Sequence, residues 1–213
     1  MLFNYFRSSS SYRVRIALNL KGLPYRYVPV HLNRDGGEQF RSGFKAINPQ
    51  GLVPVLSDHG VNISQSLAIL EYLDEKYPDT PLMPAAIEDR AYVRQLALSI
   101  ACEIHPLSNL RVLKFITGSM GLTEDVKMNW IRHWTEMGLS ALEEALSRSG
   151  KIGRFCFGDT PTIADCCLVP QLFNAQRFGI DLRSYPTLAT IDGECLKLQE
   201  FQNAHPSRQA DAE

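Results

Sequence analysis

Four consecutive serines follow an arginine near the start of the chain, in the segment from Arg7 to Ser11. The segment lies between a predicted strand, Leu2 to Phe6, and a predicted helix. Its hydroxyl and backbone N–H groups would therefore meet at a helix N-terminus, which stabilises an anion. The simpler interpretation is a helix cap in a polar turn. A nucleophilic serine is disfavoured, because no G-x-S-x-G elbow and no Ser-His-Asp set accompanies the run.

Gln65-Ser66 opens another predicted helix in the same half of the chain. Taken alone, it predicts only a helix cap, supplied by Ser64 or Ser66. Two helix N-termini in one small α/β unit could, however, converge on a single anionic ligand.

Val53-Pro54 enters a predicted strand, where proline is unusual away from edges and bends. A cis peptide bond there would leave the backbone of Val53 free to pair with an extended ligand. A trans proline at a strand edge is the commoner alternative, and the sequence leaves both open.

A proline interrupts a helical pattern in the second half, in the run EIHPLSNLR from Glu103 to Arg111. It predicts a kink with a freed backbone group beside it. His105 and Asn109 are four residues apart, so they could share one helical face near the kink. A lone histidine is more often a structural hydrogen bonder than a catalyst, so this run alone does not define a site.

The segment from Thr162 to Asp165 and the five cysteines are interpreted as structural, with no role in catalysis or metal binding. Thr162 to Asp165 has the spacing of a capping box and predicts the start of a helix. Cys166 and Cys167 are adjacent on that helix, so they cannot both face one metal or one substrate. The five cysteines lack paired metal-ligand spacing, so we expect free thiols, no metal and a reducing cytoplasm.

The composition sets the class of protein that carries these motifs. The chain has 213 residues, 45% hydrophobic and 21% charged, which is enough to bury a core. Its 22 basic and 23 acidic residues give a net charge of −1, which argues against a nucleic-acid-binding or anionic-membrane-binding surface. No apolar run approaches the ~20 residues that span a bilayer, and the first residues lack the apolar stretch of a secretion signal.

The two halves of the chain have different secondary-structure patterns, and the predicted elements would position the motifs. Residues 1–82 alternate short apolar runs with helical patterns and predict an α/β unit, whose last two strands form a hairpin at residues 58–60. Three prolines, at positions 78, 81 and 84, lie around the end of this unit. Beyond them, helical patterns at 88–115, 124–146, 162–178 and 187–201 predict an all-helical unit over residues 88–213. We expect the tail after His205 to be loose.

The order of these motifs resembles the cytosolic glutathione transferases, whose fold joins a thioredoxin-like N-terminal domain to an all-helical C-terminal domain. Residues 7–18 resemble the zeta-class signature RSSCSxRVRIAL, with Ser10 where the family has cysteine. Agreement continues through Asn48-Pro49, Val53-Pro54 and Gln65 to Ile69, and through His105 to Leu107 in the second half. The resemblance covers essentially the whole chain, and it implies a maleylacetoacetate or maleylpyruvate isomerase.

The resemblance implies roles for the residues of the first half. Ser8 would donate a hydrogen bond to the glutathione thiolate, and Ser9 and Ser10 would hold the same loop. The backbone of Val53 would pair with glutathione, and Gln65-Ser66 would bind its γ-glutamyl carboxylate. Further glutathione candidates are Gln39, His105 and Asn109.

The implied substrate is a small cis-enoyl diketo acid with two carboxylates. Thiolate addition to the cis double bond would leave a rotatable single bond, and elimination would return the trans isomer with glutathione regenerated. Such a reaction needs thiolate activation and cations for the carboxylates. The candidate cations are Arg7, Arg111 and Arg177, although Arg177 could equally be a solvated arginine at a helix end.

Several functions remain open on the sequence. The leading one is isomerisation of maleylacetoacetate in the catabolism of tyrosine and phenylalanine, and maleylpyruvate in the gentisate pathway is an alternative substrate. A transferase or dehalogenase acting on small electrophiles would share Ser8, and a non-catalytic glutathione-binding protein would share only the fold. The resemblance also implies a homodimer, the commonest closed oligomer.

Overall fold

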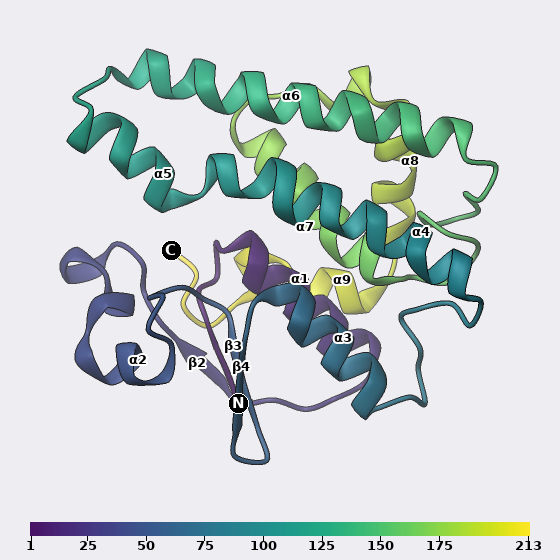
Figure 1. Ribbon diagram of the computed structural model, residues 1–213, viewed down its shortest axis with the longest axis horizontal. Helices are drawn as coiled ribbons and strands as arrows, with labels where there is room; N and C mark the ends of the chain where they lie inside the picture. Colours follow the sequence, from purple (N-terminus) through teal and green to yellow (C-terminus); the bar gives the residue numbers. More distant parts are fainter. The chain divides into compact units, whose positions relative to one another are not determined.

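The computed structural model describes residues 1–213, and its internal contacts divide the chain into two units. One unit joins Met1–Leu82 to Leu196–Glu213, and the other is Met83–Cys195. Figure 1 follows the chain through both by colour, with the C-terminal residues in yellow. The predicted all-helical unit ran from residue 88 to 213. The observed second unit ends at Cys195, and the last residues belong to the first unit.

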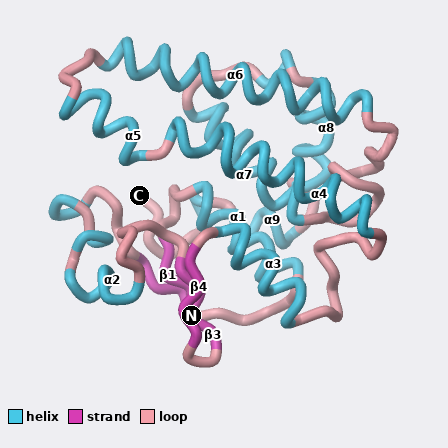
Figure 2. The backbone as a smooth tube through the Cα atoms, viewed as in Figure 1, coloured by secondary structure: helices cyan, strands magenta, loops and turns pink.

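A four-stranded sheet forms the centre of the first unit, and Figure 2 shows every strand of the chain gathered there. The strand order is β2-β1-β3-β4, with β1 parallel to β2, β1 antiparallel to β3 and β3 antiparallel to β4. The strands are β1 (Leu2–Asn4), β2 (Tyr27–Pro29), β3 (Val55–Asp58) and β4 (Val61–Ser64). The thioredoxin-like α/β unit predicted from the sequence is confirmed.

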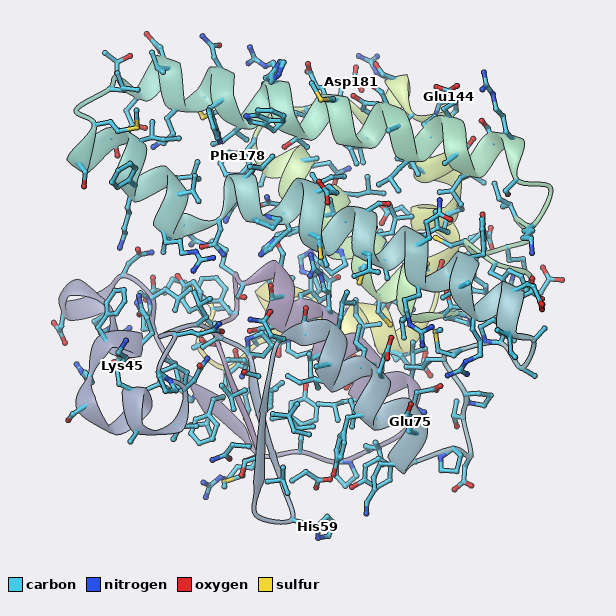
Figure 3. The ribbon with its side chains drawn as sticks, viewed as in Figure 1. Lys45, His59, Glu75, Glu144, Phe178 and Asp181 are labelled. Atoms are coloured by element: carbon cyan, nitrogen blue, oxygen red, sulfur yellow. The ribbon has the colours of Figure 1, made fainter.

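The predicted hairpin is present between β3 and β4, with Asp58 opposite Val61. His59 and Gly60 form the two-residue turn with φ of 45° and 84°. Positive φ at both central positions is the geometry of the turn that matches the twist of paired strands. Figure 3 labels His59 at the tip.

Helices α1 (Ser9–Leu20) and α3 (Ser66–Lys76) pack against each other, and α9 (Gln199–Ala204) packs against α1 (Figure 1). The fourth helix of this unit, α2 (Ser42–Ile47), follows two short 3-10 turns in the segment after β2. Two arginines, Arg13 and Arg15, are almost fully buried on α1 beside apolar residues such as Ile16. A buried guanidinium requires hydrogen-bond partners, so these residues also fix their neighbours.

The strand directions bring the polar segments of the first unit together. Because β1 and β4 are both antiparallel to β3, they run in the same direction, as does β2. The segments that follow these three strands therefore start at one end of the sheet, which we call the site end. They are the loop at 31–41, the start of α3 and residues 7–11, which we call the serine loop and which include the first turn of α1. The strand β3 begins at that end, so Val53 lies there as well.

The second unit contains α4 (Ile87–Leu98), α5 (Leu110–Lys114), α6 (Glu124–Arg148), α7 (Ile163–Arg177) and α8 (Pro186–Cys195). Helix α7 lies among its neighbours with twelve buried residues, and α6 is amphipathic and covers the core with one face. The predicted capping box is confirmed at α7. The Thr162 hydroxyl accepts a hydrogen bond from the backbone of Ala164, and the Asp165 carboxylate accepts from the N–H of Thr162 at 2.7 Å.

Two of the predicted helices are divided in the structure. The single kinked helix expected over 88–115 is wrong, because the α-helix ends at Leu98 and a π-type segment continues to Ile104. Pro106 then starts a 3-10 turn, and a new helix begins after Asn109. The helix expected over 187–201 is also wrong, since α8 ends at Cys195 and α9 starts at Gln199 in the other unit.

The C-terminal tail is not loose, contrary to the sequence-based expectation. The Asp211 carboxylate accepts a hydrogen bond from the backbone N–H of Phe6 at 3.2 Å. The Glu213 carboxylate lies 3.1 Å from His31 Nε2. Carboxylates in a short polar tail carry no local signal of such partners, so their tethering is visible only in the fold.

Two further classes of feature bear on function. No helix in the chain combines the length and apolar character needed to cross a bilayer. No group of three or more His, Cys, Asp or Glu side chains could hold a metal ion.

Candidate active site

Ser8 is the N-cap of α1, so the structure selects one of the several possible caps that the sequence offered between Ser8 and Ser11. Its backbone is extended, with φ of −72° and ψ of 117°, and its Oγ accepts a hydrogen bond from the N–H of Ser11 at 3.2 Å. The N–H of Ser8 donates to the carbonyl of Tyr5 at 3.0 Å, which closes the turn before the helix. The cap uses Oγ only as an acceptor, so the hydroxyl proton of this half-buried serine can be donated to a ligand.

The next serines complete the first turn of α1. Ser9 and Ser11 are buried, and Ser10 is half-buried. No acidic residue lies in this turn, so no carboxylate of the turn itself offsets the positive end of the helix dipole. Burial raises the pKa of the neighbouring Tyr5, despite the opposing effect of Arg7, so the Tyr5 phenol stays neutral. The serine loop therefore places hydroxyl groups at the N-terminus of α1, where the helix dipole gives a partial positive charge.

The start of α3 differs from the cap that the sequence predicted. The N-cap residue is Gln65, with φ of 70°, and neither Ser64 nor Ser66 caps the helix with its side chain. Positive φ is uncommon for a residue other than glycine and is frequent at ligand-binding sites. The first intrahelical bond is Ile69 N–H to Gln65 C=O. The three preceding N–H groups, from Ser66 to Ala68, donate to no group of the chain.

Arg13 joins the two helix starts. Its side chain is 1% exposed, and Nη1 donates to Ser66 Oγ at 3.1 Å. This contact fixes the Ser66 hydroxyl as an acceptor and leaves its proton to be donated. Sequence reasoning did not assign Arg13 a role. The available signal was a charged residue within the apolar pattern of the α1 helix.

Val53 and Gln39 lie at the same end of the sheet. The Val53–Pro54 peptide bond is cis, which decides between the two alternatives that the sequence left open. Neither the N–H nor the C=O of Val53 pairs with another backbone group. Gln39 is 5% exposed, and its Nε2 donates to the carbonyl of Leu32 at 3.3 Å, while its Oε1 is buried without a hydrogen-bond partner.

Arg7 is the only one of the three candidate carboxylate-binding arginines in the first unit. Its side chain is exposed, and the guanidinium carbon lies 4.9 Å from the centroid of the Phe6 ring. The residue directly precedes Ser8. A stacked guanidinium keeps its N–H groups available at its edge, so it can still bind a carboxylate.

The candidates of the Pro106 region do not share a helical face, which corrects the sequence-based interpretation. His105 lies in the 3-10 turn His105–Ser108, and Asn109 is extended, with φ of −67° and ψ of 144°. Asn109 caps α5, because its Oδ1 accepts from the N–H of Arg111 at 3.1 Å. Pro106 removes the helical spacing on which the i, i+4 argument depended. Arg111 is exposed in the first turn of α5.

Arg177 lies in the last turn of α7. Its Nη2 donates to Asn174 Oδ1 at 3.0 Å, and its guanidinium carbon lies 4.8 Å from the centroid of the Phe178 ring, which Figure 3 labels. The side chain is exposed, yet an amide and a ring hold it in one orientation. A held guanidinium loses less freedom when it binds a carboxylate, and it also suits the negative end of the helix dipole.

The structure thus brings together seven of the twelve predicted site residues at the site end of the first unit. They are Ser8, Ser9, Ser10, Gln39, Val53, Gln65 and Ser66. Arg7 adjoins them in sequence. His105, Asn109, Arg111 and Arg177 belong to the second unit. The arrangement in the first unit offers hydroxyl and N–H donors at two helix starts and an unpaired peptide edge between the flanking strands.

Family models and individual relatives assign the chain to the same family. Residues 7–76 match the family described as glutathione S-transferase, N-terminal domain, and residues 135–193 match glutathione S-transferase, C-terminal domain. A probable maleylacetoacetate isomerase from Vibrio cholerae is 46% identical over 212 residues, covering 100% of this chain and 98% of the relative.

Two solved structures are similar over the whole chain. One is the holo structure of a maleylpyruvate isomerase, a bacterial zeta-class glutathione S-transferase, with a TM-score of 0.96 and 44% identity, covering 100% of this chain and 99% of that one. The other is a maleylacetoacetate isomerase from Methylobacterium extorquens with bound malonate and glutathione. Its TM-score is 0.94 at 42% identity, with the same coverage.

Proposed function

Because the chain belongs to the glutathione S-transferase family, and within it to the zeta-class isomerases, we propose that it isomerises maleylacetoacetate from cis to trans with glutathione as its cofactor. The name of the Vibrio cholerae relative and the glutathione in the Methylobacterium extorquens structure support this proposal. The single observation that carries it is the convergence of proton donors and an unpaired peptide edge at the site end.

The residues of the site end fit a tripeptide with an anionic end. The N–H groups from Ser66 to Ala68 lack an acceptor in the chain, and a carboxylate at a helix N-terminus would accept from them. The N–H and C=O of Val53 lack a backbone partner, and an extended peptide pairs with such groups as an added strand does. The buried Gln39 Oε1 is a further acceptor without a partner.

Glutathione, when bound, supplies the thiol that attacks the cis double bond. A free thiol has a pKa of about 8.5, so it is mostly protonated at pH 7. A charge-assisted hydrogen bond contributes about 1.5–3 kcal/mol, which lowers the thiol pKa by about one to two units. The Ser8 hydroxyl can donate such a bond because its oxygen is held in place by the N–H of Ser11 at 3.2 Å.

The two helix starts would then divide the recognition of glutathione. Ser8 at α1 faces the thiol, while Ser66 and the free N–H groups of α3 bind the γ-glutamyl carboxylate. The buried Arg13 holds Ser66 Oγ at 3.1 Å, so this end is pre-organised. Ser9 and Ser10 hold the loop, and Gln65 adds an exposed amide that donates to Gln50 Oε1 at 2.9 Å.

The electrophile needs cations for its two carboxylates, and the arginines provide them. Arg7 directly precedes Ser8, so it is placed to bind the end nearest the thiol. Arg111 and Arg177 of the second unit are the other candidates for binding the carboxylates. His105 and Asn109 are further candidates for binding glutathione. A guanidinium fork binds a carboxylate through two parallel hydrogen bonds, which orients the substrate as well as neutralising it.

The decisive test is an incubation of the protein with maleylacetone, a maleylacetoacetate surrogate, with and without glutathione. The proposal predicts trans isomer only in the presence of glutathione, with the concentration of free thiol unchanged. Loss of free thiol with a stoichiometric conjugate would instead assign the protein as a transferase. No change in either quantity would leave a glutathione-binding protein without this activity.

Maleylpyruvate is the second candidate substrate, and it is favoured by the maleylpyruvate isomerase structure that this chain resembles at a TM-score of 0.96. Both substrates share the cis-enoyl carboxylate and differ away from it. Comparing kcat/KM for maleylpyruvate and for maleylacetone on the same protein preparation discriminates them. A ratio above about ten in either direction corresponds to ~1.4 kcal/mol of differential transition-state binding and assigns the substrate.

We also propose that the protein is a cytoplasmic homodimer. Zeta-class resemblance supports the dimer, and the requirement for reduced glutathione supports a reducing compartment. The chain mass is 24.0 kDa, so sedimentation at micromolar concentration should give about twice that mass. A mass near that of one chain would contradict the dimer, and cell fractionation with thiol-trapping would test the compartment.

A further inference from the structure

The C-terminal tail binds the segment that leads into the serine loop. Asp211 Oδ2 accepts a hydrogen bond from the N–H of Phe6 at 3.2 Å, and Asp211 Oδ1 accepts from the Tyr27 hydroxyl. Phe6 lies two residues before Ser8, and Tyr27 is the first residue of β2. The Asp211 side chain therefore links Phe6, which is 205 positions away in the sequence, to strand β2.

Arg15 holds the same segment from the other side. It is fully buried, and its Nη2 donates to the carbonyl of Phe6 at 2.9 Å, while its Nε donates to the carbonyl of Ala204 at 3.0 Å. The third nitrogen, Nη1, donates to Asn4 Oδ1 at 3.0 Å and to the carbonyl of Tyr5 at 3.4 Å. The N–H of Phe6 is thus held by Asp211 and its C=O by Arg15.

The turn that leads to Ser8 begins at the peptide groups that make these contacts. The N–H of Ser8 donates to the carbonyl of Tyr5, so the turn from Tyr5 to Ser8 is built on the peptide groups that Arg15 and Asp211 hold. A hydrogen bond weakens steeply with distance and angle, so a small rotation of this turn would misdirect the Ser8 hydroxyl. Neither Asp211 nor Arg15 belongs to the groups that would contact the thiol.

We propose that Asp211 is a positioning residue, which tethers the C-terminal tail to Phe6 and thereby holds the Ser8 hydroxyl in the orientation that lowers the glutathione thiol pKa. The inference rests on the proposed role of Ser8. The residue acts through the backbone of the loop and not through its charge.

The tail offers a matched control two residues further on. Glu213 is also a tail carboxylate, but it contacts the side chains of His31 and Arg34, each at 3.1 Å, and no backbone group of the serine loop. Glu213→Ala therefore removes a tail carboxylate without releasing Phe6. Asp211→Asn removes the charge of Asp211 and keeps an oxygen that can accept from the Phe6 N–H.

The experiment titrates the thiol of glutathione bound to each full-length variant, by the ultraviolet absorbance of the thiolate. For Asp211→Ala we expect the thiol pKa to rise by about 0.5–1 unit and kcat for maleylacetone at pH 6.5 to fall about three- to tenfold. The affinity for S-methylglutathione, which has no thiol proton, should stay within about twofold. Asp211→Asn should retain most of the wild-type behaviour, and Glu213→Ala should match the wild type.

The sign of the pKa change separates the tether from a direct effect of charge. Removing a nearby negative charge without moving Ser8 would lower the thiol pKa, because the anionic thiolate would be less disfavoured. Loss of the hydrogen-bond donor raises it. A lowered or unchanged thiol pKa in Asp211→Ala, with the protein folded as judged by its melting temperature, overturns the proposal.

A second measurement tests the tether, the hydrogen bond from the Phe6 N–H to Asp211, even if the role assigned to Ser8 is wrong. Ser8→Ala belongs in the same titration, and an unchanged thiol pKa in that variant would reject the proposed role of Ser8. The tether is then judged by the hydrogen exchange of the Phe6 amide. Exchange at least about tenfold faster in Asp211→Ala than in Glu213→Ala supports it, and equal rates overturn it.

Discussion

Helices α1 and α3 begin at the same end of the same sheet, yet their first turns are completed differently. At α1, the Ser8 hydroxyl accepts from the N–H of Ser11, so the chain satisfies part of its own helix end. At α3, Gln65 has φ of 70°, and no side chain caps the N–H groups that follow. A missing cap costs about 1 kcal/mol, so the open end is a stability loss that a bound anion would offset.

The difference indicates two kinds of recognition within one ligand. An N-cap hydroxyl retains one oriented proton, which suits a group whose protonation state must be controlled. An uncapped turn retains several N–H groups, which suits a carboxylate that is ionised throughout the physiological range. We therefore expect changes at α1 to alter the chemical step and changes at α3 to alter the affinity for glutathione.

The largest expected effect is that of Ser8→Ala. It should lower kcat for maleylacetone about 10²–10⁴-fold, the range for one positioned catalytic donor, and leave glutathione affinity nearly unchanged. Loss of the cap should also lower the free energy of unfolding by about 1 kcal/mol. Steady-state kinetics over pH 5.5–9 would check this, since the activity should recover as the thiol ionises at higher pH. A variant that keeps more than about a third of the wild-type rate would direct attention to Ser9.

The next effect concerns a residue at neither helix start. Arg177→Ala should raise KM for maleylacetone about ten- to 150-fold, corresponding to about 1.5–3 kcal/mol for a lost charge-assisted contact, with glutathione affinity unchanged. Arg177→Lys should restore only part of the loss, because it keeps the charge without the planar fork.

The matched control for this change is Arg148→Ala, which removes an arginine from the last turn of α6 in the same unit. If Arg177 served only the helix dipole, both variants would lose a few tenths to about 1 kcal/mol of stability and retain normal kinetics. An unchanged KM in Arg177→Ala would leave Arg7 and Arg111 as the carboxylate-binding candidates.

Ser66→Ala tests the uncapped end directly. It should weaken glutathione binding about five- to tenfold, because one hydroxyl contact is lost while the N–H groups of α3 remain. At saturating glutathione, kcat should stay within about twofold. Calorimetry with S-methylglutathione would measure the affinity, and Ser42→Ala, at the first residue of α2, is the control. A lowered kcat with unchanged affinity would contradict the division between the two helices.

The smallest expected effect is that of Ser10→Cys, which restores the residue typical of the zeta class. Ser10 lies inside the first turn of α1 and is not its cap, so the change should alter kcat less than about threefold. The same kinetic assay serves as the measurement. A gain of tenfold or more would show that a thiol in the serine loop takes part in the reaction.

The features predictable from the sequence are those whose partners are close along the chain. The cap at Ser8, the capping box from Thr162 to Asp165 and the turn at His59-Gly60 each depend on residues within a few positions. Their hydrogen bonds follow from local backbone geometry, so spacing and residue type are enough.

Features that depend on distant partners were missed or misassigned. The Arg13 contact with Ser66 spans 53 positions, and the Asp211 contact with Phe6 spans 205. Gln65 adopts positive φ in a tertiary setting that its residue type does not predict. At Pro106 the sequence indicated a disturbance, but whether the helix bends or stops depends on packing.

The discontinuity of the first unit has a consequence for biosynthesis. A ribosome completes residues 1–82 well before Leu196 to Glu213, and at ~5–20 residues per second the intervening 113 residues take about 6–23 s. During that interval the guanidinium of Arg15 lacks the carbonyl of Ala204, and the N–H of Phe6 lacks Asp211. A nascent chain can therefore form the sheet early, but the loop that carries Ser8 reaches its final form only when the last residues have been translated.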